Sequence, residues 1–163
     1  MSGLVEEKRL PTKRSDRVVP SVEGSRRQFP NAKAIKNGTL YFHYPCFDGL
    51  VSGVLAWVFL EHSKKWRIET FCPVSYEVRD AWSSTKLRAP AAVVDFLYHS
   101  KSTFWADHHV TTFLTKTARK QFERRKAQAC LLFDDKAASC ASLLWSRLRS
   151  CIPDAARYEE MVF

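Results

Sequence analysis

The sequence has few cysteines, and their arrangement argues against two classes of small protein. There are five of them, an odd number, and no C-x-x-C pair occurs. A disulfide framework and a zinc ribbon are therefore both disfavoured. The pattern favours reduced thiols in a cytoplasmic protein.

Long apolar segments are also missing. The longest apolar stretch, residues 50–60, has about half of the ~20 residues that a membrane-spanning helix requires. The N-terminus lacks the apolar core of a secretory signal, and its mixed charges weaken a transit-peptide interpretation. We therefore expect no membrane partner. No internal repeat is present either.

What the chain does have is enough apolar material for one domain. It contains 163 residues, 45% of them hydrophobic, with 11 Phe and 5 Trp. This predicts a single domain with a partly aromatic core, alone or with a tail. The net charge of +9 favours polyanionic partners such as nucleic acid or phosphorylated substrates, although solubility alone also explains it.

Residues 1–36 differ in composition from the rest. They contain nine Lys or Arg against four acidic residues, a net charge of +5, and three prolines interrupt them. Since no helical or strand period emerges, the segment is predicted to be a flexible, disordered tail. It is either an arm that binds nucleic acid or a solubilising extension.

From residue 37 to residue 163 the pattern is that of a folded domain. Short apolar or alternating runs predict strands at 39–43, 66–71, 91–96, 103–106 and 129–133. Longer runs predict helices at 50–62, 112–128 and 137–149, and 155–161 is helix-like. The first helix is apolar almost all round, so we expect it to be buried on several sides. Strands that alternate with helices predict an α/β domain with a mainly parallel sheet flanked by helices.

Polar side chains of one chemical kind follow three of these strands. His43 and Asp48 follow the first, Asp95 ends the third, and Asp107-His108-His109 follow the fourth. Ligands of open parallel sheets bind outside the carboxyl ends of the strands, so we expect these residues to gather along one edge. Imidazole and carboxylate groups there suit Mn²⁺, Zn²⁺ or Mg²⁺.

Each signal also has an ordinary explanation when taken alone. A single histidine such as His43 is commonly a surface residue, and Asp48-Gly49 is a common turn signal. Asp95 could cap a helix. A metal site is favoured because all these residues occur together, each at or just after the end of a predicted strand.

Three motifs in this order resemble the DHH phosphoesterase superfamily. They are H-Y-P-C-F-D-G-L-V-S-G (43–53), V-V-D-F (93–96) and A-D-H-H (106–109). The likeness spans about residues 39–163, and the first motif is similar to that of an uncharacterised H-x-x-C-x-D-G branch. The superfamily includes single-strand DNA exonucleases, nano-RNases, cyclic-dinucleotide phosphodiesterases and manganese-dependent inorganic pyrophosphatases. The resemblance therefore implies a hydrolase that acts on a phosphorylated small molecule or a short nucleic acid.

The resemblance also implies roles for individual residues. His43 and Asp48 are expected to be metal ligands, and Asp95 is expected to bridge two ions. His108 is expected to bind the second ion with support from Asp107, so the implied metal set is His43, Asp48, Asp95, Asp107 and His108. His109 is expected to face the substrate phosphate, with catalytic roles for His109 and Asp107. The implied cofactor is Mn²⁺ at two sites, with Zn²⁺, Co²⁺ or Mg²⁺ as alternatives.

The sequence departs from the superfamily pattern in two places. Many members have D-x-D-G in the first motif, whereas here Cys46 replaces the first acid. Its thiolate would favour zinc or iron, or the thiol is inert. The fourth-motif Asp and a C-terminal substrate domain are also expected beyond Phe163, so we expect a truncated catalytic domain. An alternative function follows from both departures: a degenerate domain that binds nucleotide or nucleic acid without turnover.

A basic helix and several tryptophans are further candidates for binding. Residues 116–126 hold six basic residues and one acid. Lys116 and Arg119 are predicted to contact substrate phosphate, although a solvated helix face also explains the charge. Trp82, Trp105 and Trp145 could stack on bases, but core packing is the favoured interpretation for each.

Overall fold

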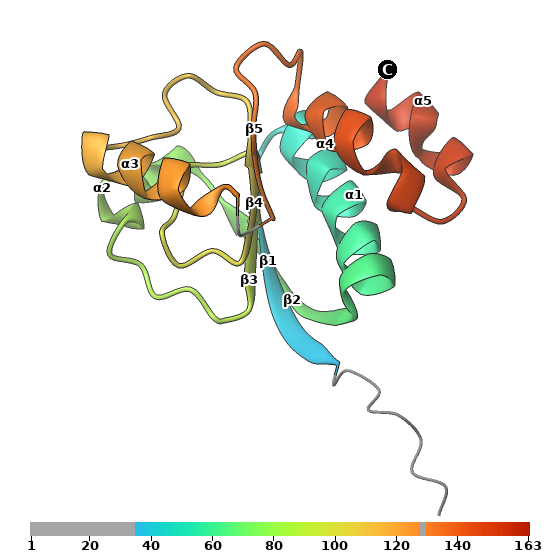
Figure 1. The fold of residues 1–163 in the computed structure, drawn as a ribbon, viewed down its shortest axis with the longest axis horizontal. Coiled ribbons are helices and arrows are strands. Elements are labelled where there is room, and N and C mark those ends of the chain that lie inside the picture. The colour runs from blue at the N-terminus through green and yellow to red at the C-terminus, as the bar shows by residue number, and fades with distance from the viewer. Residues whose placement is uncertain (1–34, 128–129) are drawn as a thin grey trace, which may run out of the picture. The chain divides into compact units, whose positions relative to one another are not determined.

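The computed structural model describes residues 35–127 and 130–163, which form one α/β unit around a five-stranded sheet (Figure 1). The predicted tail lies outside the described residues except for its last two, and the second of these, Lys36, already begins β1. The strand order is β2-β1-β3-β4-β5 and every neighbouring pair is parallel. The strands are β1 (Lys36–His43), β2 (Trp66–Val74), β3 (Ala91–Val94), β4 (Phe104–Asp107) and β5 (Cys130–Phe133).

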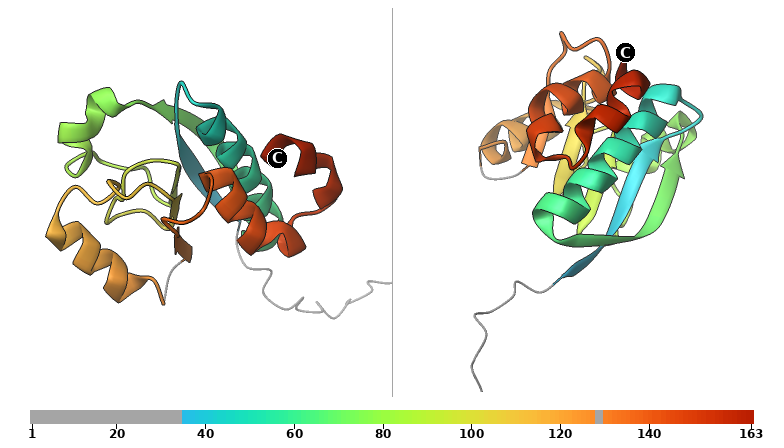
Figure 2. Two further views of the ribbon diagram at one scale, coloured as in Figure 1. Left: turned by 90° about the horizontal axis from the view of Figure 1, so that it is seen from above. Right: turned by 90° about the vertical axis from the view of Figure 1, so that its right-hand side faces the viewer.

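Helices cover both faces of this sheet, so the predicted α/β class is confirmed. Helices α1, α4 and α5 lie on one face, and α2 and α3 lie on the other (Figures 1 and 2). Their bounds are α1 (Phe47–Lys64), α2 (Arg79–Trp82), α3 (Lys116–Arg125), α4 (Cys140–Leu148) and α5 (Glu159–Val162). The helix-like run at 155–161 is a 3₁₀ turn, Ala155–Tyr158, that leads into α5. None of the helices in the described ranges combines the length and hydropathy of a membrane-spanning segment.

Capping residues explain why two helices start later than predicted. The hydroxyl of Thr115 accepts a hydrogen bond from the N–H of Ala118, so α3 begins at Lys116 instead of residue 112. Ser139 and Ser142 form a reciprocal capping box, so α4 begins at Cys140 instead of residue 137. The first residue of the strand predicted at 129–133 lies outside the described residues.

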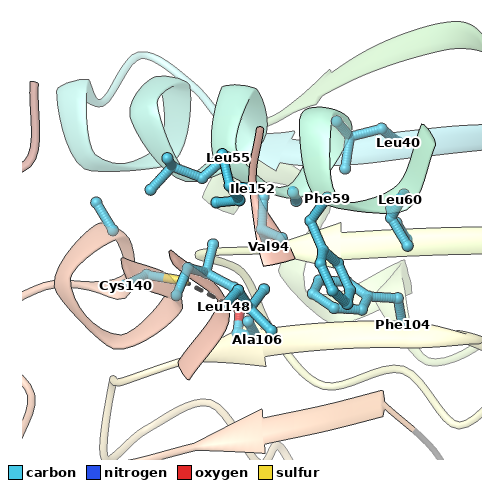
Figure 3. Close-up of a cluster of buried hydrophobic side chains, with 14 of the residues drawn as sticks. Leu40, Leu55, Phe59, Leu60, Val94, Phe104, Ala106, Cys140, Leu148 and Ile152 are labelled. Carbon is cyan, nitrogen blue, oxygen red and sulfur yellow. Dashed lines mark hydrogen bonds between the residues drawn. The ribbon is translucent and has the colours of Figure 1, made fainter. Parts of the chain in front are cut away.

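Two apolar layers hold the helices on the sheet. Figure 3 shows one of them, where Leu55 and Phe59 of α1 and Leu148 of α4 pack against Val94 and Phe104 of the sheet. The other layer is strongly aromatic and contains Trp82 and Trp105, each 1% exposed or less. Trp145 is also buried. Core packing is therefore the role of all three tryptophans.

Helix α1 is buried against the sheet and against α4, as expected, but it is not buried all round. Its inner face is buried, but Phe47 is 72% exposed, Leu50 48% and Trp57 38%. Helix α4 packs along one flank of α1. The other flank lies over β2, the edge strand of the sheet, where no further described element covers it.

Candidate metal centre

The register of the sheet places three of the predicted site residues side by side. Phe42 of β1 pairs with Val94 of β3, and Val94 pairs with Ala106 of β4. The next residue along each chain segment is His43, Asp95 and Asp107 respectively. The chain runs outward from β1 to β2 on one side and from β3 through β4 to β5 on the other. The site therefore lies at the topological switch point of the sheet, the usual ligand position in doubly wound folds.

Asp95 is the central residue of this site. It follows β3 directly, adopts a left-handed backbone with φ of 53°, and is fully buried. Aspartate tolerates this conformation better than most residues, but it is still uncommon outside glycine. The turn ends the strand at Val94, two residues earlier than predicted. It also directs the two carboxylate oxygens of Asp95 to different neighbours.

One oxygen of Asp95 faces the end of β1. Its Oδ2 lies 3.4 Å from Nδ1 of His43. The imidazole of His43 is held by the ring of Tyr76, at 4.9 Å between centroids, and by that of Phe96, at 5.9 Å. Burial lowers the pKa of His43, and His109 lowers it further. Both effects favour the neutral imidazole that a metal ion requires.

The other oxygen of Asp95 faces the end of β4. Its Oδ1 lies 3.9 Å from Nε2 of His108 and 3.7 Å from Nδ1 of His109. His108 approaches the carbonyl oxygen of Ala137 with its Nδ1, at 3.2 Å. When Nδ1 carries the proton and donates a hydrogen bond to this carbonyl oxygen, Nε2 is unprotonated. Its lone pair is then available to a metal ion at the site.

Asp107 orients the two histidines that follow it. Its Oδ1 accepts hydrogen bonds from the backbone N–H of His108, at 2.7 Å, and from Nδ1 of His109, at 2.8 Å. The hydrogen bond to Asp107 raises the pKa of His109, against the effect of its partial burial. The expected supporting role of Asp107 thus has a direct geometric counterpart.

Asp48 lies at the opposite side of the site, on the first turn of α1. Its Oδ2 is 3.5 Å from Nε2 of His108. Both of its oxygens also accept backbone hydrogen bonds from the N-terminus of α4, from Cys140 and Ala141, each at 2.8 Å. Gly49 permits this placement, since a Cβ there would overlap the carbonyl oxygen of His43.

These distances suit ions held between the side chains. Metal–nitrogen and metal–oxygen bonds of about 2.0–2.2 Å place two ligands of one ion roughly 3.0–3.6 Å apart. The separations of Asp95 from His43 and His108, 3.4 and 3.9 Å, are within a few tenths of an ångström of that range. Oδ1 of Asp95 and Oδ2 of Asp107 are buried without a hydrogen-bond partner among the described residues. Orphaned carboxylate oxygens of this kind are what a cation would satisfy.

Two groups of potential ligands meet at this point. One consists of Asp95, Asp107, His108 and His109, and the other of His43, Cys46 and Asp95. Within each group the ligand atoms lie within 4.8 Å of one another. Asp95 belongs to both groups, so potential metal ligands lie on either side of one carboxylate.

Burial, together with the charges of Asp48 and Asp107, raises the pKa of Asp95 to about 8. A carboxyl with a raised pKa holds its proton more tightly in the folded chain than in the unfolded chain. The free energy of unfolding of the metal-free protein should therefore fall as the pH rises from about 4 to about 8. Urea unfolding in chelator at about pH 5 and about pH 8 measures this slope. The slope should be shallower in Asp95→Asn, and equal slopes in both proteins would contradict the assignment.

Two of the three residues predicted to contact substrate phosphate, Lys116 and Arg119, lie on α3, away from the clustered side chains. The guanidinium of Arg119 lies over the rings of Phe113 and Phe133 and pairs with Glu123 at 3.0 Å. Lys116 is exposed. No hydrogen bond or ion pair joins either residue to the clustered side chains in the described part of the chain. A phosphate-binding role for Lys116 and Arg119 stays a prediction.

Sequence reasoning missed the residues that support the ligands. Ser52 donates a hydrogen bond to Oδ1 of Asp48 at 3.2 Å, and its spacing of four residues on one helix face was a usable signal. Tyr76 and the carbonyl of Ala137 gave no such signal in the sequence. Tertiary folding alone brings Tyr76 to His43 and the Ala137 carbonyl to His108.

Searches of protein-family models, curated proteins and solved structures found no match to this chain. The resemblance to DHH phosphoesterases therefore rests on the three motifs and stays a prediction. The arrangement of potential metal ligands stands independently of it.

Proposed function

We propose that this chain is a metal-dependent phosphoesterase of the DHH type. It binds two divalent ions, one on each side of Asp95, and hydrolyses a phosphodiester or phosphoanhydride in a nucleotide or a short oligonucleotide-like substrate. The observation that carries the proposal is the position of Asp95, whose two oxygens face His43 on one side and His108 and His109 on the other. A carboxylate placed in this way holds the spacing of a two-metal site.

The charge of the site supports cation binding. Burial raises the pKa of Asp95, and the nearby charges of Asp48 and Asp107 raise it further by repulsion. Divalent ions relieve this repulsion, and at a phosphoryl group they supply charge neutralisation and Lewis acidity. Oxygen and imidazole ligands on the β4 side suit Mn²⁺, which we propose as the ion there, with Mg²⁺, Co²⁺ or Zn²⁺ as competitors.

His109 has the properties of a proton donor to the leaving group. Its side chain is 36% exposed, so it can face a substrate that enters from solvent. Its Nδ1 forms a hydrogen bond with Oδ1 of Asp107 at 2.8 Å, so Nε2 is the ring nitrogen that remains available to a substrate. The raised pKa of His109 keeps the protonated form available closer to neutral pH.

The proposal predicts metal-dependent hydrolysis that requires His108. Metal-free protein should be inactive, and added Mn²⁺ should restore cleavage of bis(p-nitrophenyl) phosphate, a dinucleotide or pyrophosphate. His108→Ala should lose the activity and one equivalent of bound metal, because it removes a ligand from the β4 side. His62→Ala is the matched control, since His62 is an exposed histidine near the end of α1. Full activity of purified His108→Ala would overturn the proposal.

A metal-binding or nucleotide-binding domain without turnover is the second candidate. Asp48 favours it, since both of its oxygens already accept hydrogen bonds from α4 and are less available to an ion. This candidate predicts measurable nucleotide affinity with no hydrolysis of any substrate in the panel. Metal stoichiometry near two together with turnover would exclude it.

A further inference from the structure

Cys46 is the one member of the two ligand groups whose chemistry differs from the rest. It occupies the N-cap position of α1, two residues before Asp48, without a capping hydrogen bond from its side chain, which is partly buried. Its sulfur belongs to a group with His43 and Asp95 in which all ligand atoms lie within 4.8 Å of one another. The group on the β4 side contains only nitrogen and oxygen ligands.

We propose that Cys46 is a thiolate ligand and that the site is a mixed-metal centre. Its β1 side, formed by His43, Cys46 and Asp95, selects Zn²⁺, Co²⁺ or Fe²⁺. Its β4 side, formed by Asp95, Asp107 and His108, accepts harder ions such as Mn²⁺ or Mg²⁺. The inference rests on the metal binding in the proposed function but does not depend on turnover.

The chemistry of the ligands gives this selectivity. Thiolates favour zinc, copper(I) and iron, whereas carboxylates and water suit manganese and magnesium. Binding breaks the S–H bond of Cys46, forms a metal–sulfur bond and releases one proton to solvent, with no change in oxidation state. Metal–sulfur bonds of about 2.3 Å are longer than those to nitrogen or oxygen, so a site with one sulfur tolerates slightly wider ligand spacing.

The side chains around His43, Cys46 and Asp95 restrict the movement of these potential ligands. Tyr76 and Phe96 pack on the His43 ring and restrict its rotation. Asp95 is fully buried, and its Oδ2 lies 3.4 Å from Nδ1 of His43 within this group. A buried carboxylate requires a compensating charge or hydrogen bonds, and a cation held by His43, Cys46 and Asp95 would supply that charge. The other oxygen, Oδ1, has no hydrogen-bond partner among the described residues and faces the β4 side, where it favours a cation in the same way.

The other cysteines supply internal controls. Cys140 is buried, and its thiol donates to the carbonyl oxygen of Ala106 at 3.4 Å, a contact that Figure 3 shows inside the core. Cys151 is exposed at the surface, and Cys72 lies half-buried on β2. Neither Cys72 nor Cys151 belongs to a potential metal group within the described ranges.

A titration of metal-free protein with Co²⁺ tests the assignment. Thiolate coordination gives an intense near-ultraviolet charge-transfer band, which nitrogen and oxygen ligands do not give. We expect this band in the wild type, in Cys72→Ser and in His108→Ala, and its loss in Cys46→Ser. A band that persists in Cys46→Ser, or a wild-type protein that binds cobalt without the band, overturns the proposal.

Alkylation of the unmodified wild-type protein gives a second test that needs no variant. Zn²⁺ should slow iodoacetamide modification of Cys46 by tenfold or more, as mapped by mass spectrometry, while Cys151 reacts at an unchanged rate. Mn²⁺ at the same concentration should protect Cys46 much less. Equal reactivity of Cys46 with and without Zn²⁺ overturns the proposal.

The two tests separate this inference from the proposed function. Two bound cobalt ions without the charge-transfer band would refute thiolate ligation and leave the phosphoesterase proposal standing. The band together with no hydrolysis of any substrate would support thiolate ligation and refute the phosphoesterase. A protein that binds no cobalt at all refutes both.

Discussion

Replacement of Asp95 by asparagine should remove hydrolysis and reduce bound metal from two equivalents to one or none. Asp95 is the only residue shared by the two potential ligand groups. An uncharged amide in its place weakens both metal positions at once. Lewis-acid stabilisation is worth several kcal/mol and each 1.36 kcal/mol is a tenfold change in rate, so the loss should be about 10³-fold or more.

Asparagine is the informative substitution because it should leave the fold intact. It matches aspartate in shape and tolerates the left-handed backbone that Asp95 adopts, with φ of 53°. It also carries no charge, so it relieves the repulsion from Asp48 and Asp107 in the metal-free protein. Thermal unfolding in chelator should therefore show equal or greater stability than the wild type at about pH 8.

The matched control for this variant is Asp80→Asn, which changes an exposed aspartate on α2. It should retain two equivalents of metal and wild-type activity. Elemental analysis of the purified proteins and hydrolysis of a dinucleotide measure both quantities. Two bound ions in Asp95→Asn would show that Asp95 is not a bridging ligand and would remove the main support for the proposed function.

The sequence was sufficient to predict which residues lie at the carboxyl edge of the sheet, but not which of them are neighbours there. His43, Asp95 and Asp107 each come at or just after the end of an apolar strand, and parallel strands end on the same side. The strand order was needed to make them neighbours, and it places β1, β3 and β4 side by side. Local patterns indicate the strands but do not fix this order, so the adjacency came from the structure.

The position of Asp48 shows what local patterns cannot predict. Its hydrogen bonds to Cys140 and Ala141 span 92 and 93 residues. They form because α4 starts beside α1, and that start is fixed by the capping box of Ser139 and Ser142. The same packing leaves one flank of α1 exposed, where apolar composition alone predicted burial. In each case tertiary contacts decide a feature that composition and spacing leave open.

Replacement of His109 by asparagine should lower kcat by about 10²–10⁴-fold on substrates with a poor leaving group. The asparagine amide can still donate to Oδ1 of Asp107, which His109 contacts at 2.8 Å, but it cannot deliver a proton. Bound metal and KM should stay near wild-type values. Since the pKa of His109 is raised, wild-type kcat should fall on the alkaline side above the ordinary histidine range, and this limb should be absent in the variant.

The leaving group separates proton donation from the other role open to His109, since this residue also belongs to the β4-side ligand group. p-Nitrophenolate leaves without protonation, whereas a ribose alkoxide needs a proton in the transition state. A proton donor therefore predicts a small loss on bis(p-nitrophenyl) phosphate and a large loss on a dinucleotide. A metal ligand predicts large losses on both, together with a lower metal content. Equal losses on the two substrates with full metal content would exclude His109 as the general acid and leave it an orienting role toward substrate.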